Sequence, residues 1–480
     1  MSESGRHSKV VHIIPLSIVL LYIVLLFAIT WATRRLSRGG MIAYLLAGRA
    51  LPSWVIAPLL AGLAIGGAST IGVAESAYKT GLSEGWYNAA WASGAILVGL
   101  VAARRYRSLD IATLPELFER YYSLSGRLVG VFGQLVLHVV IISLQYVAGG
   151  AILSSLLPDV FSFRSGMFVT ALVFGGITLI GGFWAAGLTN IINVVFIYIG
   201  VVLGAILTVR KAGGLAELVA RLPPQHPGFD LGAIGWSLII AWFLVMATMT
   251  FSVQSVVQIG FAAKDASAAR RGFLLGGLMI LPVGFISAVL GISAAVLHPG
   301  IIPTEALPRM MLDLSPVVAG LFLAALWAAD VSTASVLLLG SATLVMNDLV
   351  KRFVVSDLKE SQERIVSRVS VLALSALTYL LAISISGILN TLLIGLTLTT
   401  AYTLVTLMTL FWPKVCRRSH ATWTLLMTMG ALGLWMIFPA IPVFFQRIRL
   451  SHPIYFCWMV SLATFFLVAV LDKRPIERRA

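Results

Sequence analysis

The sequence predicts an all-α, polytopic membrane protein, and three observations carry this prediction. Of the 480 residues, 59% are hydrophobic and only 11% are charged, whereas a soluble domain carries roughly 25% charged residues. The mean hydropathy is +0.97. Apolar runs longer than the roughly 17 residues that a spanning helix needs recur from one end of the chain to the other.

We count thirteen such runs and predict one spanning helix for each. The loops between them reach only about twenty residues, too short for a soluble catalytic domain of roughly 50 residues or more. We therefore predict a single transmembrane domain over residues 1–480. The predicted spans are 11–33, 52–77, 82–103, 127–156, 164–182, 186–209, 232–260, 272–298, 315–347, 365–385, 387–412, 421–445 and 453–471.

The basic residues indicate the orientation of the chain. Lys and Arg gather in alternate loops and in the tail, a bias that marks the cytoplasmic side. The N-terminus is therefore predicted outside and the C-terminus in the cytoplasm, in a plasma (inner) membrane. The net charge of +15 is then a topology signal, with no nucleic-acid partner implied. The chain has no Asn-x-Ser/Thr sequon, which fits a prokaryotic source. The basic loops are 34–49, 104–127, 264–271, 351–368, 414–418 and 473–479.

Glycines interrupt the second predicted span. Residues 61–72 read AGLAIGGASTIG, and clustered glycines favour unwinding. A broken helix at this depth would free carbonyls for cations, as in secondary transporters; close helix packing through small residues is the alternative. The matching interruption expected within 232–260 is marked only by Thr248, Thr250 and Ser252, without Gly or Pro.

A polar cluster lies inside the ninth predicted span. On a helix, Ala329, Ser332 and Thr333 fall at about 0°, 300° and 40°, which is one narrow face. Two hydroxyls and a carbonyl there, with carbonyls freed between Gly62 and Ile65, could complete a five-oxygen site suited to sodium. The alternative is that both hydroxyls bond back to carbonyls of their own helix.

Asp330 flanks this face, at about 100° on the same helix. A carboxylate at membrane depth is costly and usually serves a function. Three interpretations stay open for it. It strengthens cation binding, it carries a proton that couples transport, or it is buried in its protonated form.

Seven segments in order resemble the sodium:solute symporter family over roughly residues 11–470. The resemblance implies a LeuT-type fold with two inverted five-helix repeats (52–209 and 232–412), one extra N-terminal helix (11–33) and two extra C-terminal helices (421–471). It also implies alternating access and no enzymatic activity. The segments are YLLAGRALPSW (44–54), AGLAIGGASTIG (61–72), GLSEGW (81–86), DIATLPELFERYY (110–122), LIGGFWAAGLTN (179–190), QSVVQIGFAAKDASAARRG (254–272) and AADVSTASVLLLGSATLVMNDLVKR (328–352).

The resemblance also implies site residues. The sodium ligands would be the carbonyls of Gly62, Ile65 and Ala329 and the hydroxyls of Ser332 and Thr333. An acidic residue common in the family is Asn190 here, which puts a second sodium site near Ser335 in doubt. Asp330 stands where relatives usually carry an apolar residue. The implied solute pocket is lined by Ser69, Gln145, Trp242, Met246, Phe251 and Gln254.

The predicted function is sodium-coupled import of a small organic solute, of the monocarboxylate or amino-acid class, across a lipid bilayer. The presumed pocket offers few charges, so a polyanion fits less well. The alternative is a proton-coupled symporter that uses Asp330, and a sensor or channel on the same fold is the third hypothesis. The sequence does not predict an oligomeric state.

Overall fold

The structure is a computed structural model that describes residues 13–476 except 38–39, 157, 313 and 385–387. Within these ranges every named element is a helix, and β pairing is limited to two isolated bridges. The predicted all-α class is therefore confirmed. The start of the predicted span 11–33 and the predicted boundary between 365–385 and 387–412 involve residues outside the described ranges.

The first half of the chain contains four long helices and several short ones. The α-helices are α1 (Ile13–Thr33), α2 (Met41–Leu46), α3 (Ser53–Ala64), α4 (Val73–Thr80), α5 (Trp86–Val101), α6 (Ala103–Ser108), α7 (Leu114–Tyr121), α8 (Leu124–Leu156), α9 (Phe163–Lys211) and α10 (Leu215–Ala220). The 3-10 and π segments are η1 (Arg34–Ser37), η2 (Ala47–Arg49), η3 (Ala68–Gly72) and η4 (Gly81–Gly85).

The second half repeats this mixture of long and short helices. The α-helices are α11 (Trp236–Ser252), α12 (Gln254–Phe261), α13 (Ala266–Leu297), α14 (Ala306–Leu312), α15 (Pro316–Thr343), α16 (Glu360–Ala382), α17 (Ile388–Leu396), α18 (Thr400–Phe411), α19 (His420–Ile437), α20 (Ala440–Arg447) and α21 (Pro453–Leu471). The other segments are η5 (Pro303–Glu305), η6 (Leu344–Val354), η7 (Thr397–Thr399) and η8 (Pro413–Val415).

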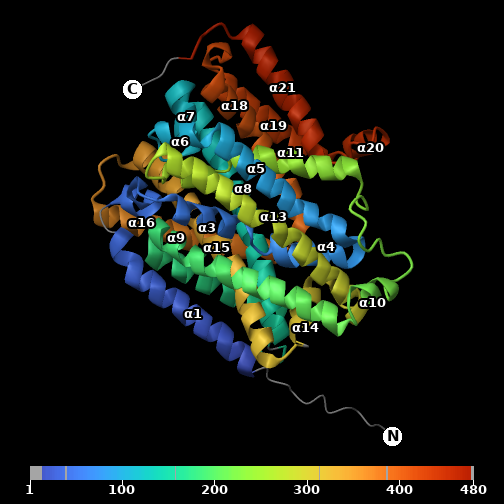
Figure 1. Cartoon of the computed structure of the whole chain (residues 1–480). Coiled ribbons are helices and arrows are strands. Elements are labelled where there is room, and N and C mark those ends of the chain that lie inside the picture. The colour runs from blue at the N-terminus through green and yellow to red at the C-terminus, as the bar shows by residue number, and fades with distance from the viewer. Residues whose placement is uncertain (1–12, 38–39, 157, 313, 385–387, 477–480) are drawn as a thin grey trace.

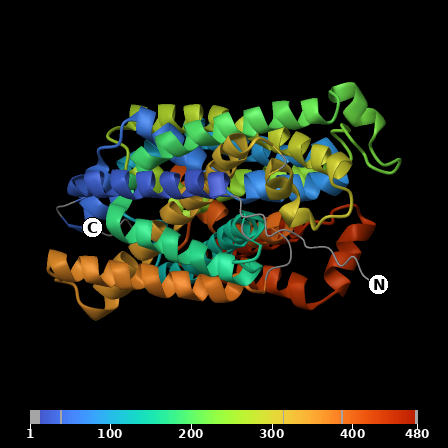
Figure 2. The ribbon, with the colours of Figure 1, turned by 90° about the horizontal axis from the view of Figure 1, so that it is seen from below.

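Many of these helices can cross a bilayer. Eight described helices are long and apolar enough, or up to eleven spans if each of three bent pairs is one crossing. The long helices run in the same general direction in both views (Figure 1, Figure 2). A multi-pass membrane protein is therefore supported, while the number thirteen stays a prediction.

Helix α15 is the centre of the bundle. In its most apolar stretch 94% of the residues are buried, against 28% for α1. It packs against α9, α1, α8 and α16. Helix α1 lies on one flank of the molecule and α21 on the opposite flank (Figure 1). The polar cluster predicted on α15 is therefore shielded from lipid by its neighbours.

Helix α9 and the pair α19–α20 are not straight single spans. At 1.5 Å per residue, the 49 residues of α9 would reach roughly 70 Å, more than twice the bilayer core. Gly182, at φ 74°, divides α9 into two helices, a backbone conformation that favours glycine. The predicted span 421–445 contains a bend of 91° between α19, which ends at Ile437, and α20. Pro439, which lacks an N–H, stands at that turn.

Candidate functional site

The glycine-rich segment is a broken helix, as predicted. Helix α3 ends at Ala64, and Ile65 has a non-helical backbone with φ −91° and ψ 73°. The chain resumes as the π segment η3, and the two parts are bent by 55°. Gly66 and Gly67 lie at the break, where a larger residue would not fit. A Cβ added to Gly66 would lie 2.5 Å from Thr333 Oγ1, and one added to Gly67 would lie 2.4 Å from the Cβ of Ala148. Carbonyls at the end of α3 are thereby turned out of the normal helical ladder.

A second break lies between α11 and α12, at Val253, with a bend of 49°. No Gly or Pro marks it. Gln134 of α8 takes the place of the missing helical partners: its Nε2 donates to Ser252 O at 2.6 Å, and its Oε1 accepts from Gln254 N at 3.0 Å. Thr403 of α18 donates to Thr248 O at 2.7 Å. Thr248, Thr250 and Ser252, the positions that mark this segment in the sequence, thus lie directly before a break.

Four of the five groups predicted to bind sodium, those of Gly62, Ala329, Ser332 and Thr333, come together. Ser332 Oγ donates to Gly62 O at 2.7 Å and to Ala329 O at 2.7 Å. Thr333 Oγ1 donates to Gly62 O at 3.0 Å and Leu63 O at 3.1 Å. Both side chains are buried. Thr333 therefore bonds across to α3 and not back to its own helix, and Ile65 lies just beyond these carbonyls at the break.

Asp330 lies on the neighbouring face of α15 and is fully buried. Neither of its carboxylate oxygens has a hydrogen-bond partner among the described residues. A Cβ added to Gly67 would lie 2.7 Å from Asp330 Oδ1, so the carboxylate faces the helix break. The Gly67 N–H donates instead to Gln145 Oε1 at 2.8 Å.

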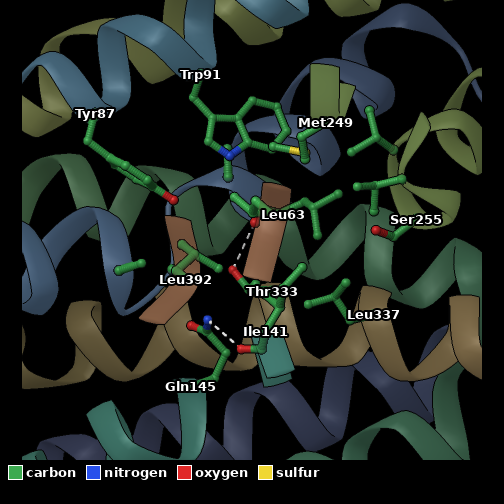
Figure 3. A pocket seen from close by; sticks show the side chains of 16 residues that line it. Leu63, Tyr87, Trp91, Ile141, Gln145, Met249, Ser255, Thr333, Leu337 and Leu392 are labelled. Atoms are coloured by element: carbon green, nitrogen blue, oxygen red, sulfur yellow. Dashed lines mark hydrogen bonds between the residues drawn. The ribbon is translucent and has the colours of Figure 1, made fainter. Parts of the chain in front are cut away.

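A small cavity of about 30 Å³ lies beside the break (Figure 3). Of the six residues that the sequence suggests for the solute pocket, Gln145 lines it, together with Thr333 of the candidate sodium site. Tyr87 and Trp91 of α5 form the wall across from Gln145 (Figure 3). These two aromatic residues could not be singled out from the sequence, because nothing local distinguishes them from other residues of the predicted span 82–103. The remaining lining residues are Leu63, Ala64, Gly66, Ala68, Ile141, Met249, Val253, Ser255, Val256, Leu337, Leu392 and Leu396.

The other five suggested solute residues are buried but do not line this cavity. Ser69 Oγ donates to Ala64 O at 2.5 Å, within the break itself. Trp242, Met246 and Phe251 lie in the core along α11. Gln254 donates to Ala112 O at 3.1 Å and accepts from Leu114 N at 2.8 Å, which joins α12 to the start of α7.

Comparison with curated proteins gives relatives that carry solutes. The chain is 25% identical over 460 residues to the high-affinity proline transporter PutP of Bacillus subtilis, covering 90% of this chain and 93% of that protein. It is 28% identical over 381 residues to the sodium/pantothenate symporter of Escherichia coli, covering 75% and 77%. It is 25% identical to sodium/glucose cotransporter 4 of Danio rerio, over 76% of this chain, but it spans only 62% of the length of that protein.

Solved structures share the fold at low sequence identity. A substrate-bound, outward-open Na⁺-coupled sialic acid symporter matches with a TM-score of 0.79 at 17% identity, over 97% of this chain and 99% of that one. A nucleobase-cation-symport-1 family transporter in a closed conformation matches with a TM-score of 0.62 at 16% identity, over 89% and 94%. These matches agree with the expected LeuT-type fold.

The family assignment rests on a match over most of the chain. The model of the sodium:solute symporter family matches residues 44–427, which include both broken helices and the polar cluster of α15. The family and the relatives above are transporters and not enzymes. The chain therefore belongs to the sodium:solute symporter family.

Proposed function

We propose that this chain is a sodium-coupled symporter that imports a small organic solute by alternating access. The observation that carries the proposal is the contact between α15 and the end of α3, where Ser332 Oγ and Thr333 Oγ1 lie 2.7 and 3.0 Å from Gly62 O. With the carbonyls of Ile65 and Ala329, these groups make five oxygen donors. Freed carbonyls at a broken helix are a common way to bind the coupling cation in secondary transporters.

The coupling follows from which elements supply the oxygens. The ligands come from two elements, the broken segment α3–η3 and the helix α15, so sodium stabilises the conformation in which both lie close together. A ligand shifts a conformational equilibrium only through its different affinities for the two states. Sodium is therefore proposed to bind first, to hold the outward-open state, and to raise the affinity for the solute. By linkage, the solute raises the affinity for sodium by the same factor.

The proposed membrane arrangement follows the predicted one. It has thirteen spans in a plasma (inner) membrane of a prokaryote, with the N-terminus outside and the C-terminus in the cytoplasm. The two breaks, at residues 65–67 and at Val253, are proposed to lie at corresponding positions of two inverted five-helix repeats. This arrangement brings both breaks to the middle of the bilayer, where a solute and its coupling ion meet.

The double variant Ser332→Ala, Thr333→Ala tests the sodium site without knowledge of the solute. The wild-type protein in detergent is expected to gain thermal stability with NaCl over KCl, because a ligand that binds only the folded state stabilises it, by about 2.7 kcal/mol at a hundred times its Kd. The double variant is expected to lose this gain and to lose ²²Na⁺ binding.

A matched control is the variant Thr208→Ala, Ser293→Ala. Its two hydroxyls donate to carbonyls of their own helices, Thr208 to Gly204 O and Ser293 to Val289 O, both at 2.8 Å. This control should retain the sodium response. A sodium response of wild-type size in the Ser332→Ala, Thr333→Ala protein would remove the site assignment.

Proteoliposomes distinguish the other hypotheses once a solute is known. Uptake driven by a pH gradient alone, without sodium, would favour proton coupling. A simple channel would show no saturable counterflow, whereas a symporter exchanges labelled for unlabelled solute.

A further inference from the structure

An ionised Asp330 requires a positive partner, and the described residues provide no hydrogen-bond partner for either of its oxygens. The side chain is fully buried. Removing an ionised carboxylate from water costs several kcal/mol unless a cation and hydrogen bonds compensate. The proposed sodium ligands are all neutral oxygens on an adjacent face, and Asp330 is not one of them.

The geometry around Asp330 leads to the cavity. Its Oδ1 and Gln145 Oε1 face the same glycine, since a Cβ on Gly67 would lie 2.7 and 3.4 Å from them. A Cβ added to Gly66 would likewise lie 2.6 Å from Gln145 Oε1. Gly66, Ala68 and Gln145 all line the cavity. The carboxylate therefore lies next to Gly67 and close to Gln145, which lines the cavity.

The surroundings of Asp330 suit an ammonium group better than a second metal ion. A calcium ion takes about six to eight oxygen ligands, and the three groups nearest to a Cβ built on Gly67 are the apolar Cβ of Ala148, the carboxylate of Asp330 and Gln145 Oε1. A protonated amine has at most three N–H donors to satisfy, and a quaternary ammonium has none and is held by negative charge and aromatic rings. Within the described residues, no group of three or more His, Cys, Asp or Glu side chains could hold a metal ion.

The opposite wall of the cavity is also suited to a cation. Tyr87 and Trp91 present aromatic rings across from Gln145 (Figure 3), and such rings attract cationic nitrogens within about 6 Å. No Lys, Arg or His is among the lining residues, so the cavity has no cationic side chain for a simple carboxylate.

We propose that the transported solute carries a cationic nitrogen, which Gln145 Oε1 and the carboxylate of Asp330 receive beside the helix break. This inference rests on the proposed symport function and names its substrate class as amino acids, betaines or related amines. The apolar and aromatic walls then hold the rest of a small solute. Gln145 makes the first contact, and Asp330 supplies the charge behind it.

Pairs of solutes that match in shape and differ in charge test the inference. The probes are L-proline with cyclopentanecarboxylate, glycine betaine with 3,3-dimethylbutanoate, and choline with 3,3-dimethylbutan-1-ol; within each pair the cationic nitrogen is replaced by carbon. Thermal stabilisation of the wild-type protein and of Asp330→Asn is titrated with each probe in NaCl and in KCl. At least one cationic member should bind the wild type in NaCl with an affinity at least tenfold above its carbon partner, and Asp330→Asn should abolish this preference.

Three results would overturn the inference: a carbon analogue that binds as tightly as its cationic partner, a panel in which no cationic member stabilises the protein, or an undiminished preference in Asp330→Asn. Failure of the proposed function has a different signature. Equal solute binding in NaCl and KCl would contradict sodium coupling, while the preference within each pair would still decide the role of Asp330.

Discussion

Two buried aspartates on one continuous helical stretch, Asp330 on α15 and Asp348 on η6, have opposite surroundings. Both are fully buried. Asp348 Oδ1 accepts from Arg127 Nε at 2.6 Å and from Thr113 Oγ1 at 2.9 Å. Asp330, at the helix break, has no hydrogen-bond partner among the described residues.

The difference distinguishes a carboxylate with partners in the protein from one that has no hydrogen-bond partner among the described residues. Around Asp348, Arg127 also donates to Glu119 at 2.6 Å and to the carbonyl of Asn347 at 3.0 Å, so one guanidinium joins α7, α8 and η6. Arg352 pairs with the same Glu119 at 2.7 Å. Asp348 thus has a cationic partner and two hydrogen bonds within the protein, all through its Oδ1, while its Oδ2 has no hydrogen-bond partner among the described residues. A carboxylate left unpaired in the core instead suits a partner that binds and leaves.

The largest expected effect comes from breaking the paired region. Arg127→Ala leaves Asp348 buried without its cation, which typically costs about 3–5 kcal/mol. We expect the free energy of unfolding, measured by denaturant titration in mixed micelles, to fall by that amount. Arg352→Ala is the matched control, because its side chain is 45% exposed and exposed ion pairs contribute about 0–1 kcal/mol. Equal losses in the two variants would show that the Arg127 network has no special structural role.

Replacing each aspartate by asparagine compares the two positions directly. Asp348→Asn weakens charged hydrogen bonds that are worth about 1.5–3 kcal/mol, and we expect a loss of that size. Asp330→Asn removes a buried carboxyl group that has no hydrogen-bond partner among the described residues, so the free energy of unfolding in sodium-free buffer should stay the same or rise. A loss for Asp330→Asn as large as that for Asp348→Asn would mean that Asp330 already has a partner in the folded protein.

The periodicity of a helix made part of the site predictable. Ser332 and Thr333 share a face because of their spacing, and the glycines of 61–72 predicted the break that they meet. The second break could not be located from the local sequence. Its backbone carbonyls accept hydrogen bonds from Gln134 and Thr403, which lie on helices that are distant in sequence. A pair such as Arg127 and Asp348, 221 residues apart, cannot be read from local patterns. The missing partner of Asp330 likewise emerges only from the packed structure.

The break itself gives the third prediction. An alanine Cβ at Gly67 would lie 2.4 Å from the Cβ of Ala148 and 2.7 Å from Asp330 Oδ1. Overpacking of this kind costs about 1–3 kcal/mol, so Gly67→Ala should lower the thermal midpoint and weaken sodium stabilisation. A Cβ added to Gly433 in α19 would meet no neighbouring atom within 4 Å, and Gly433→Ala should be neutral or gain up to about 1 kcal/mol from helix propensity. Similar behaviour of the two variants would contradict the tight approach at Gly67.

The smallest expected effect is a pH dependence of the paired region. Burial raises the pKa of Glu119 on α7, but hydrogen bonds and charges from Arg352 and Arg127 outweigh it, so the pKa lies below its ordinary value. A carboxyl group with a lower pKa in the folded state contributes stability above its unfolded pKa of about 4.3, and loses that contribution as the pH falls through the folded pKa. The thermal midpoint should therefore drop as the pH is lowered from about 6 towards about 3. Glu119→Gln should show a shallower drop, because its amide has no proton to gain in this range, and superimposable pH profiles would mean that the arginines do not hold Glu119 in its charged form.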